Sequence, residues 1–465
     1  MRLRFADGRA AALAVLLAAG ACGQAERVEP TVVRSPPPGA DAPSTPPGAD
    51  APSTPARSRS PAAALPGRIA VVGTDGRLVT VAADGSDQRV LTPAGVRVSF
   101  PAWAPDGERL AALASNGTTG ELYVLEDGEP ALAADPPVPL YSSADRGPFY
   151  LYWAPDGRSV AFLAPEPPEL ALHVVGVERE APSRIVARGQ PLYWDWLDGG
   201  DRLLVHAGTG PDAQLGPVER DGDATEPRIA QPGLFQAPGV SPDGRYWAYG
   251  VFGEGGPDRL VIEDRQSGAR QAAAHRGVAA LAWSPTTDTV AYLSPERQID
   301  AFLGPLRLLD ARTGEGRLLA DETVFGFFWS PDGQSIAYFA APGQSDPGPV
   351  ARSSTGLLAA WPPSGHAIMP VAQEGPLGID LVVVKVDDGE PTLRHTFRPP
   401  SVFLEQFLPF FDQYARSHSI WSPDSSALVL PTLDEAGRAH IEVIPSDGGQ
   451  PTVVAEGEMA FWSRP

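Results

Sequence analysis

The sequence is poor in the residues on which most enzymatic and metal sites depend. It has one cysteine, Cys22, in 465 residues, which excludes intramolecular disulfides and zinc clusters made of several thiolates. Its seven histidines are scattered and no His-Glu-x-x-His pattern occurs, so we expect neither a metal site nor a cofactor. A Gly-x-Ser-x-Gly nucleophile elbow is also missing, so no α/β-hydrolase domain is expected.

Positive charge is scarce as well. The chain has 36 Lys and Arg residues against 57 Asp and Glu residues, which gives a formal net charge of −21. Because nucleic acids repel a protein of the same sign, this balance argues against a nucleic-acid partner.

The N-terminus has the features of an export signal. Arg2, Arg4 and Arg9 precede a short apolar run, and Ala19-Gly20-Ala21 supplies the small residues of a cleavage site. A run of about a dozen apolar residues is too short for a stable transmembrane helix. Residues 1 to 21 are therefore predicted to be a signal peptide.

Cys22 directly follows this signal. It resembles the cysteine of a bacterial lipobox, which becomes the lipid-modified first residue of the mature protein. Ala19 departs from that pattern, since leucine is usual three positions before the cysteine. The resemblance implies an exported lipoprotein, anchored to a membrane and facing the periplasm or the cell exterior. An ordinary cleaved signal with an incidental cysteine is the alternative.

The next stretch, residues 22 to 66, is rich in Pro, Ala and Ser. Within it Pro-Pro-Gly-Ala-Asp-Ala-Pro-Ser-Thr occurs twice. Such a composition cannot bury a hydrophobic core. We predict a disordered tether that joins an acylated Cys22 to a folded domain spanning residues 67 to 465.

Within that domain one phrase recurs: an apolar run that ends in Trp, a Ser/Ala-Pro-Asp-Gly turn, and a second apolar run. The clearest copies begin at Trp103, Trp153 and Trp329, and Val240 takes the tryptophan's place in a looser one. The repeat anchors are Trp103, Trp153, Trp196, Trp283, Trp329, Trp421 and Trp462.

The turn residues account for this phrase. Proline fixes φ at the second position of a type I turn, Asp suits the third, and Gly takes the left-handed position that follows. A residue that recurs in every copy of a repeat is expected to have a structural role in that repeat. The recurring Asp is therefore interpreted as a turn residue and not as a catalytic acid. It stands at Asp106, Asp156, Asp243, Asp332 and Asp424.

The spacing of the anchors predicts the architecture. With Val240 counted as an anchor, neighbouring anchors lie 41 to 50 residues apart, except for an interval of 92 between Trp329 and Trp421. Short strands at this period are typical of a β-propeller with four strands per blade. We predict an all-β fold of eight blades, closed by pairing of the last strand with the first ones. A ninth blade is the alternative, because Trp361 resembles a degenerate anchor; we favour an inserted loop at about 342 to 377.

A second insertion, at about 401 to 418, is the least repetitive stretch. Its aromatic residues fall at helical spacings, and Pro409 is expected to kink the helix. One hypothesis is that the two insertions shape a binding surface; the other is that the helix caps the ring and buries its own aromatics. The candidate binding residues are Trp361, Phe403, Phe407, Phe410, Phe411 and Tyr414.

The Trp-Ser-Pro-Asp-Gly repeats resemble those of the TolB-type, WD-like propellers over residues 67 to 465. They also resemble the propeller of prolyl-oligopeptidase-like peptidases. The first resemblance implies a periplasmic protein that docks partners. Two departures stand beside it: TolB-type proteins carry a separate α/β domain before a six-bladed propeller, and the peptidases carry an α/β-hydrolase domain.

Together these features predict a cell-envelope lipoprotein that is not an enzyme and whose propeller binds an envelope protein or a peptide. No oligomerisation signal stands out, so we expect a monomer. Two alternatives stay open: a sensor of small ligands such as glycans or peptides, and a hydrolase or lyase that uses the central funnel.

Overall fold

Short antiparallel strands joined by tight turns make up most of the described chain. The described residues belong to one compact unit, Ala64–Pro363 with Ala367–Pro465. Cys22, Trp361 and the predicted signal peptide lie outside them. The structure, a computed structural model, describes residues 65–128, 138–178, 182–222, 230–233, 237–252, 258–275, 280–293, 303–343, 378–387 and 389–464.

The first three sheets have four strands each. One has the order β29-β1-β2-β3, with bounds Met459–Trp462, Arg68–Val72, Leu78–Ala82 and Arg89–Val90. The next is β4-β5-β6-β7, with bounds Arg97–Trp103, Arg109–Ser115, Gly120–Glu126 and Tyr141–Ser143. The third is β8-β9-β10-β11, with bounds Tyr150–Trp153, Ser159–Glu166, Glu169–Gly176 and Arg184–Gly189.

The following sheets are less regular. One is β12-β13-β14, with bounds Leu192–Leu197, Arg202–Ala207 and Gln214–Glu219. Its neighbour is β15-β16-β17-β18, with bounds Gly239–Val240, Tyr246–Val251, Asp258–Asp264 and Arg270–His275. The last sheet is β26-β27-β28, with bounds Ala427–Leu433, Ala439–Pro445 and Thr452–Glu456.

Between these stands a sheet of seven strands that runs in order from β19 to β25. Its bounds are Leu281–Trp283, Thr289–Leu293, Gly304–Asp310, Gly316–Trp329, Ser335–Ala340, Ile379–Lys385 and Pro391–Phe397. The 14-residue β22 joins its two parts, because the residues near Gly316 pair with β21 whereas those near Trp329 pair with β23.

The turns form as their residues predict. Gly107 and Gly157 take φ of 70° and 66°, the left-handed region that glycine enters without strain. In each of the five copies the Asp side chain accepts a hydrogen bond from the backbone N–H two residues on, as at Asp106 and Asp332 (2.9 and 3.0 Å). The interpretation of these Asp residues as turn residues is confirmed.

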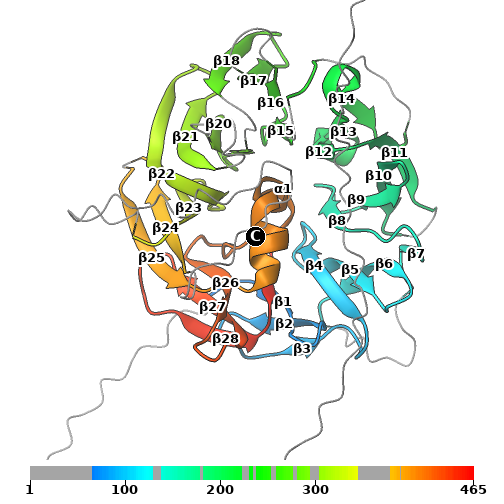
Figure 1. The fold of residues 1–465 in the computed structure, drawn as a ribbon, viewed down its shortest axis with the longest axis vertical. Coiled ribbons are helices and arrows are strands. Elements are labelled where there is room, and N and C mark those ends of the chain that lie inside the picture. The colour runs from blue at the N-terminus through cyan, green and yellow to red at the C-terminus, as the bar shows by residue number, and fades with distance from the viewer. Residues whose placement is uncertain are drawn as a thin grey trace, which may run out of the picture. The chain divides into compact units, whose positions relative to one another are not determined.

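Strands from the two ends of the domain pair with each other. β1 lies antiparallel to β29, in a register that places Ile69 opposite Trp462 and Val72 opposite Met459. The predicted closing pair is therefore present. Figure 1 shows the sheets arranged radially around the short helix α1 (Phe411–Ser417), and apolar side chains fill the space between neighbouring sheets. The chain is a mostly antiparallel β-propeller, so the predicted all-β class is confirmed.

The anchor tryptophans link one sheet to the next. The indole N–H of Trp103 donates to the carbonyl oxygen of Phe461 (3.1 Å), and that of Trp153 donates to Ala102 (2.9 Å). Trp329 donates to Ala282 and Trp421 donates to Phe328, both at 3.1 Å. In every case the acceptor is the residue just before the preceding anchor, so these four bonds form a regular tryptophan ladder.

The ladder is incomplete. The indole nitrogens of Trp196, Trp283 and Trp462 are buried without a hydrogen-bond acceptor among the described residues, and Val240 has no indole to offer. Asp195 replaces one missing link, because its carboxylate accepts a hydrogen bond from the Val240 backbone N–H (2.9 Å). We call the side of the ring from β12 to β19, with the anchors Trp196, Val240 and Trp283, the seam.

Candidate functional site

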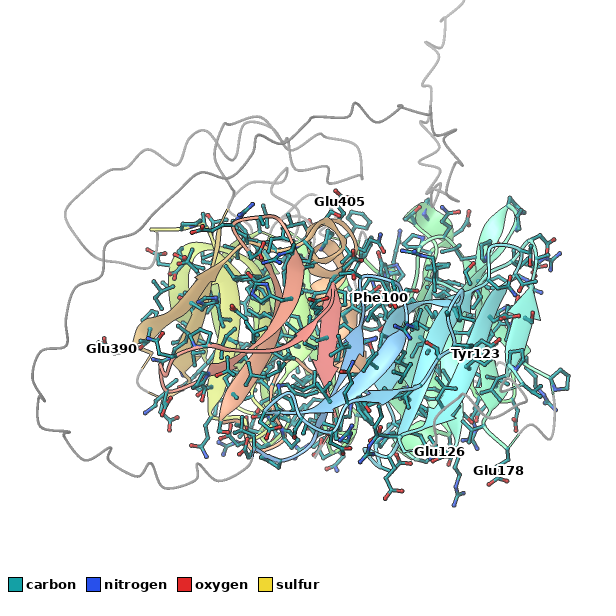
Figure 2. All side chains as sticks on the ribbon, turned by 90° about the horizontal axis from the view of Figure 1, so that it is seen from below. Phe100, Tyr123, Glu126, Glu178, Glu390 and Glu405 are labelled. Atoms are coloured by element: carbon teal, nitrogen blue, oxygen red, sulfur yellow. The ribbon has the colours of Figure 1, made fainter. Side chains whose placement is uncertain are left out.

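Both predicted insertions leave the ring at the same end of its strands. β23, β24 and β25 are antiparallel, and the register places Ala340 opposite Asp380 and Ile379 opposite Phe397. The connection from β23 to β24 and the segment after β25 therefore start on one face, which we call the insertion face. The Pro-Asp-Gly turns lie at the other ends of the strands. Figure 2 agrees, since Glu405 lies on one face and Glu126 and Glu178 lie on the opposite one.

Residues 398 to 418, which we call the axial segment, fold into three short helical pieces. A π-helix spans Phe403–Phe407, a 3-10 helix spans Leu408–Phe410, and α1 spans Phe411–Ser417. Pro409 lies in the first turn of the middle piece, where its missing N–H removes no helical hydrogen bond. The prediction of a helix interrupted at Pro409 fits this division.

Four of the five described candidate aromatics point into the ring. Phe403, Phe407, Phe411 and Tyr414 are each at most 5% exposed. Phe407 stacks on Phe328 with ring centroids 5.7 Å apart, so the segment packs against the inner strand β22. Phe410 differs, with 46% of its surface exposed. Burial of a large aromatic is worth about 1.5–3 kcal/mol, so the four buried rings make this segment part of the core.

A β-bulge in β4 completes the aromatic packing. Phe100 lies where the register of β4 and β5 shifts, with a φ of 45° that a non-glycine residue rarely adopts. Its ring stacks on Tyr414 at a centroid distance of 4.8 Å. Its carbonyl oxygen accepts a hydrogen bond from Nε2 of His418 (3.0 Å). The bulge therefore turns both a ring and a carbonyl toward the axial segment.

His418 is held neutral by its surroundings. Burial lowers its pKa to about 3, and only the neutral ring can accept at Nδ1 the hydroxyl of Ser417 (2.6 Å). A Ser–His pair at this distance is found in nucleophilic sites. Here Ser417 and His418 are 3% and 2% exposed, so a substrate would not reach them in this conformation.

Arg416 ties α1 to the seam. Its guanidinium donates to the carbonyl oxygens of Trp194 and Ala237 (3.4 Å each) and of Pro238. It also lies 3.4 Å from the Asp195 carboxylate, and both side chains are largely buried. The axial segment thus contacts sheets on opposite sides of the ring.

Burial dominates the ionisation of the two axial carboxyls. It raises the pKa of Asp195, although Arg416 and the N–H groups of Val240 and Trp196 act against that effect. It also raises the pKa of Asp412 to about 6, with only partial compensation from Arg416. A carboxyl titrating near neutrality inside the ring was not expected from the sequence, because its burial depends on where α1 lies.

Two of the scattered histidines meet on one carboxylate. His395 of β25 and His440 of β27 approach the two oxygens of Glu442, at 2.9 and 3.1 Å from their Nε2 atoms. The hydrogen bond from His395 lowers the pKa of Glu442. Among the residues that the structure describes, no group of three or more His, Cys, Asp or Glu side chains is placed to hold a metal ion.

A small cavity of about 140 Å³ lies away from the insertions, beside β16, β17 and β18. Arg245, Asp264, Gln271 and Arg312 line it together with one aromatic ring, that of Tyr246. Arg245 and Asp264 already form an ion pair at 2.8 Å. No described helix is long and apolar enough to span a membrane.

No protein-family model and no curated protein matches this chain. Solved structures that resemble it include TolB from Acinetobacter baumannii, 19% identical over 55% of this chain and 65% of that one, with a TM-score of 0.35. The present chain thus spans just under two thirds of that structure's length. An oligogalacturonate lyase in complex with manganese is 14% identical over 84% of this chain and 85% of its own, with a TM-score of 0.42. At these identities the likeness bears on the fold alone.

The expectation that the chain is not an enzyme, which rests on the lack of catalytic motifs in its sequence, is wrong. Similar solved structures include that lyase, a prolyl endopeptidase and the dihydro-heme d1 dehydrogenase NirN. The prolyl endopeptidase is 12% identical over 79% of this chain and 50% of its own, with a TM-score of 0.48. Because catalytic proteins share the ring, a propeller without familiar motifs is no ground for excluding catalysis. None of these activities is carried over to this chain.

Proposed function

We propose that the chain is a cell-envelope lipoprotein, acylated at Cys22, whose propeller binds an envelope protein or a peptide at the insertion face. The TolB-like ring, the export signal and the tether in the sequence support this proposal. Binding at a face of the ring needs only an exposed, fixed surface, which a closed propeller provides.

The proposed ring has eight blades. The seven-stranded sheet then counts as two blades that share β22, because its first part pairs with β21 and its last part pairs with β23. The other described sheets supply six more. A short pairing of Trp421 with Leu428 gives the blade of β26 an inner edge, and Ser419 pairs with Trp462 of the closing sheet.

One observation carries the choice of face. The two insertions that break the repeat leave the same end of the same sheet, and Phe410 of the axial segment, which starts at that end, is 46% exposed. Its immediate neighbours along the chain are the partly buried Pro409 and the buried Phe411, so a fixed aromatic projects from a packed base. Exposed aromatics on a rigid support are typical of interface hot spots.

The axis supports a surface site better than a funnel site. Phe407, Tyr414 and His418 are buried where an open funnel would have its mouth. The described cavity of about 140 Å³ lies elsewhere and has one aromatic residue, Tyr246. A small-ligand sensor would gather several aromatic and polar groups around one pocket.

The test is affinity capture of the full-length protein from the envelope of its own host, with mass spectrometry of the captured proteins and of the N-terminal residue. Phe410→Ala is expected to lower the yield of a specific partner by about tenfold or more, as loss of a hot-spot aromatic does. Leu393→Ala is the matched control, because Leu393 is 47% exposed on the outer strand β25.

Two outcomes would contradict the proposal separately. An unmodified Cys22 would contradict the proposed membrane anchor but not the proposed binding face. Equal partner yield from wild type and Phe410→Ala would contradict binding at the insertion face but not the proposed membrane anchor.

A further inference from the structure

Two carboxyl groups are buried near the axis of the ring, and one of them has no ion pair among the described residues. Asp412 and Asp195 are 3% and 8% exposed, and they come from α1 and from β12. Arg416 lowers the pKa of both against the effect of burial, and it forms its ion pair with Asp195. That ion pair leaves Asp412, which is buried from water, without an ion pair of its own among the described residues.

Arg416 is not placed to serve both carboxylates. Besides Asp195, its guanidinium is held by the carbonyl oxygens of Trp194, Ala237 and Pro238. Asp412 lies four residues earlier on the same short helix and forms no ion pair among the described residues. A buried carboxylate without a partner is costly, and the usual response is to take up a proton.

The other groups that face the axis form no ion pair with Asp412 in the described part of the chain. From β8 and β12 come Tyr150, Tyr152 and Tyr193, whose pKa values burial raises far above neutrality. His418 is neutral, with a pKa lowered by burial to about 3. Arg464, which follows β29, is a second cation near the axis, but its guanidinium donates to the backbone carbonyl of Arg416 and not to Asp412. Asp195 is the other titratable acid: burial raises its pKa as well, and its ion pair with Arg416 acts against that effect.

We propose that Asp412 binds a proton under mildly acidic conditions, and that its protonated side chain holds the axial segment more firmly in the ring. This stabilisation of the axial segment does not depend on whether the proposed partner exists. Its consequence for binding rests on the proposed function, because Phe410 lies two residues before Asp412 and would be held more firmly as well.

The sign follows from the two states of the chain. The pKa of Asp412 is about 6 in the fold against 3.8 for a free side chain, so the folded state binds the proton more tightly. The resulting stability is complete below pH of about 4 and is lost as the pH rises through about 6. Between pH 4.5 and pH 8 the unfolding equilibrium constant should rise roughly thirtyfold from this group alone.

The experiment measures urea unfolding of the full chain between pH 4.5 and pH 8 for wild type and Asp412→Asn. Asparagine mimics the protonated acid, so the ratio of the wild-type to the variant unfolding constant should rise roughly thirtyfold across this range. Glu405→Gln is the control, because Glu405 is exposed on the same segment, and it should follow the wild type. A ratio that does not change with pH would overturn the proposal.

Should Asp412→Asn fail to fold, the wild type alone decides. The backbone N–H of His418 donates to the Tyr414 carbonyl (2.7 Å) and reports opening of α1. Its opening constant, taken from hydrogen exchange after correction for the intrinsic rate, should rise from pH 5 to pH 7.5. An opening constant that stays flat over this range would overturn the proposal.

Discussion

The ring is held together in two different ways on its two sides. At Trp103, Trp153, Trp329 and Trp421 the anchor indole donates to the inner strand of the preceding blade. Along the seam from Trp196 to Trp283 this bond is missing at each anchor, and outside the seam it is also missing at Trp462. Asp195 and Arg416 replace it with a carboxylate, a guanidinium and three backbone carbonyls.

The difference shows what an insertion can do in a repeat protein. A regular blade binds its neighbour through its own anchor. The seam depends instead on α1, which belongs to a blade on another side of the ring (Figure 1). The axial segment, which follows β25, thereby stabilises contacts between β12 and β15. The residues that join these two blades therefore need a partner residue from a distant part of the chain.

The largest effect should come from removing the cation of the seam. Arg416→Met leaves Asp195 buried without its ion pair, which typically costs about 3–5 kcal/mol of unfolding free energy. Arg146→Met is the control, because Arg146 pairs with Glu166 at the surface, where an ion pair is worth about 0–1 kcal/mol. Urea unfolding of the full chain measures both. Equal losses for the two variants would show that Arg416 does not brace the seam.

A smaller difference in stability is expected between alanine variants of two glycines at equivalent turn positions. Gly244 and Gly333 have φ of 75° and 68°, so alanine at either position costs about 1–2 kcal/mol. A Cβ at Gly333 would also lie 2.1 Å from Oγ1 of Thr286 in the neighbouring turn, whereas at Gly244 it meets open space. Gly333→Ala should therefore have the lower unfolding midpoint in urea. A lower midpoint for Gly244→Ala would argue against tight turn contacts on the ladder side.

The smallest effect concerns the indole bonds themselves. Trp103→Phe and Trp196→Phe remove similar apolar volume at sites that are 2% and 4% exposed. Only the first also removes a hydrogen bond and leaves the Phe461 carbonyl without it, so it should cost about 1 kcal/mol more. The difference between the two unfolding free energies is the quantity to measure. A difference of zero would mean that the ladder contributes through packing alone.

Local residue chemistry made the blades predictable. Proline, Asp and Gly at fixed offsets determine the turns, and the period of the anchors implies a ring whose ends pair, as β1 and β29 do. The aromatic spacing of the axial segment also indicated a helix. The turns and the helix depend on residues close together in the sequence, and the pairing of the chain ends follows from the repetition of the blades.

The axial cluster depends on contacts between distant residues, which explains why it was missed. Asp195 and Arg416 are 221 positions apart in the chain, and nothing near either one marks it as half of a buried ion pair. The positive φ of Phe100 and its bond to His418 likewise arise only when β4 and the axial segment meet. The sequence did contain one usable signal: Asp195 stands among apolar and aromatic residues in Leu192–Leu197, where a carboxylate needs a partner.

Hydrogen exchange of the full-length chain, compared between wild type and Arg416→Met, tests most directly whether α1 braces the seam. Loss of protection should concentrate on the Val240 amide, which is bonded to Asp195, and on the strands β12, β15 and β16. Protection of β1 and β29, which lie in the closing sheet, should stay as in the wild type. A loss spread evenly over all sheets, or confined to α1, would contradict the account.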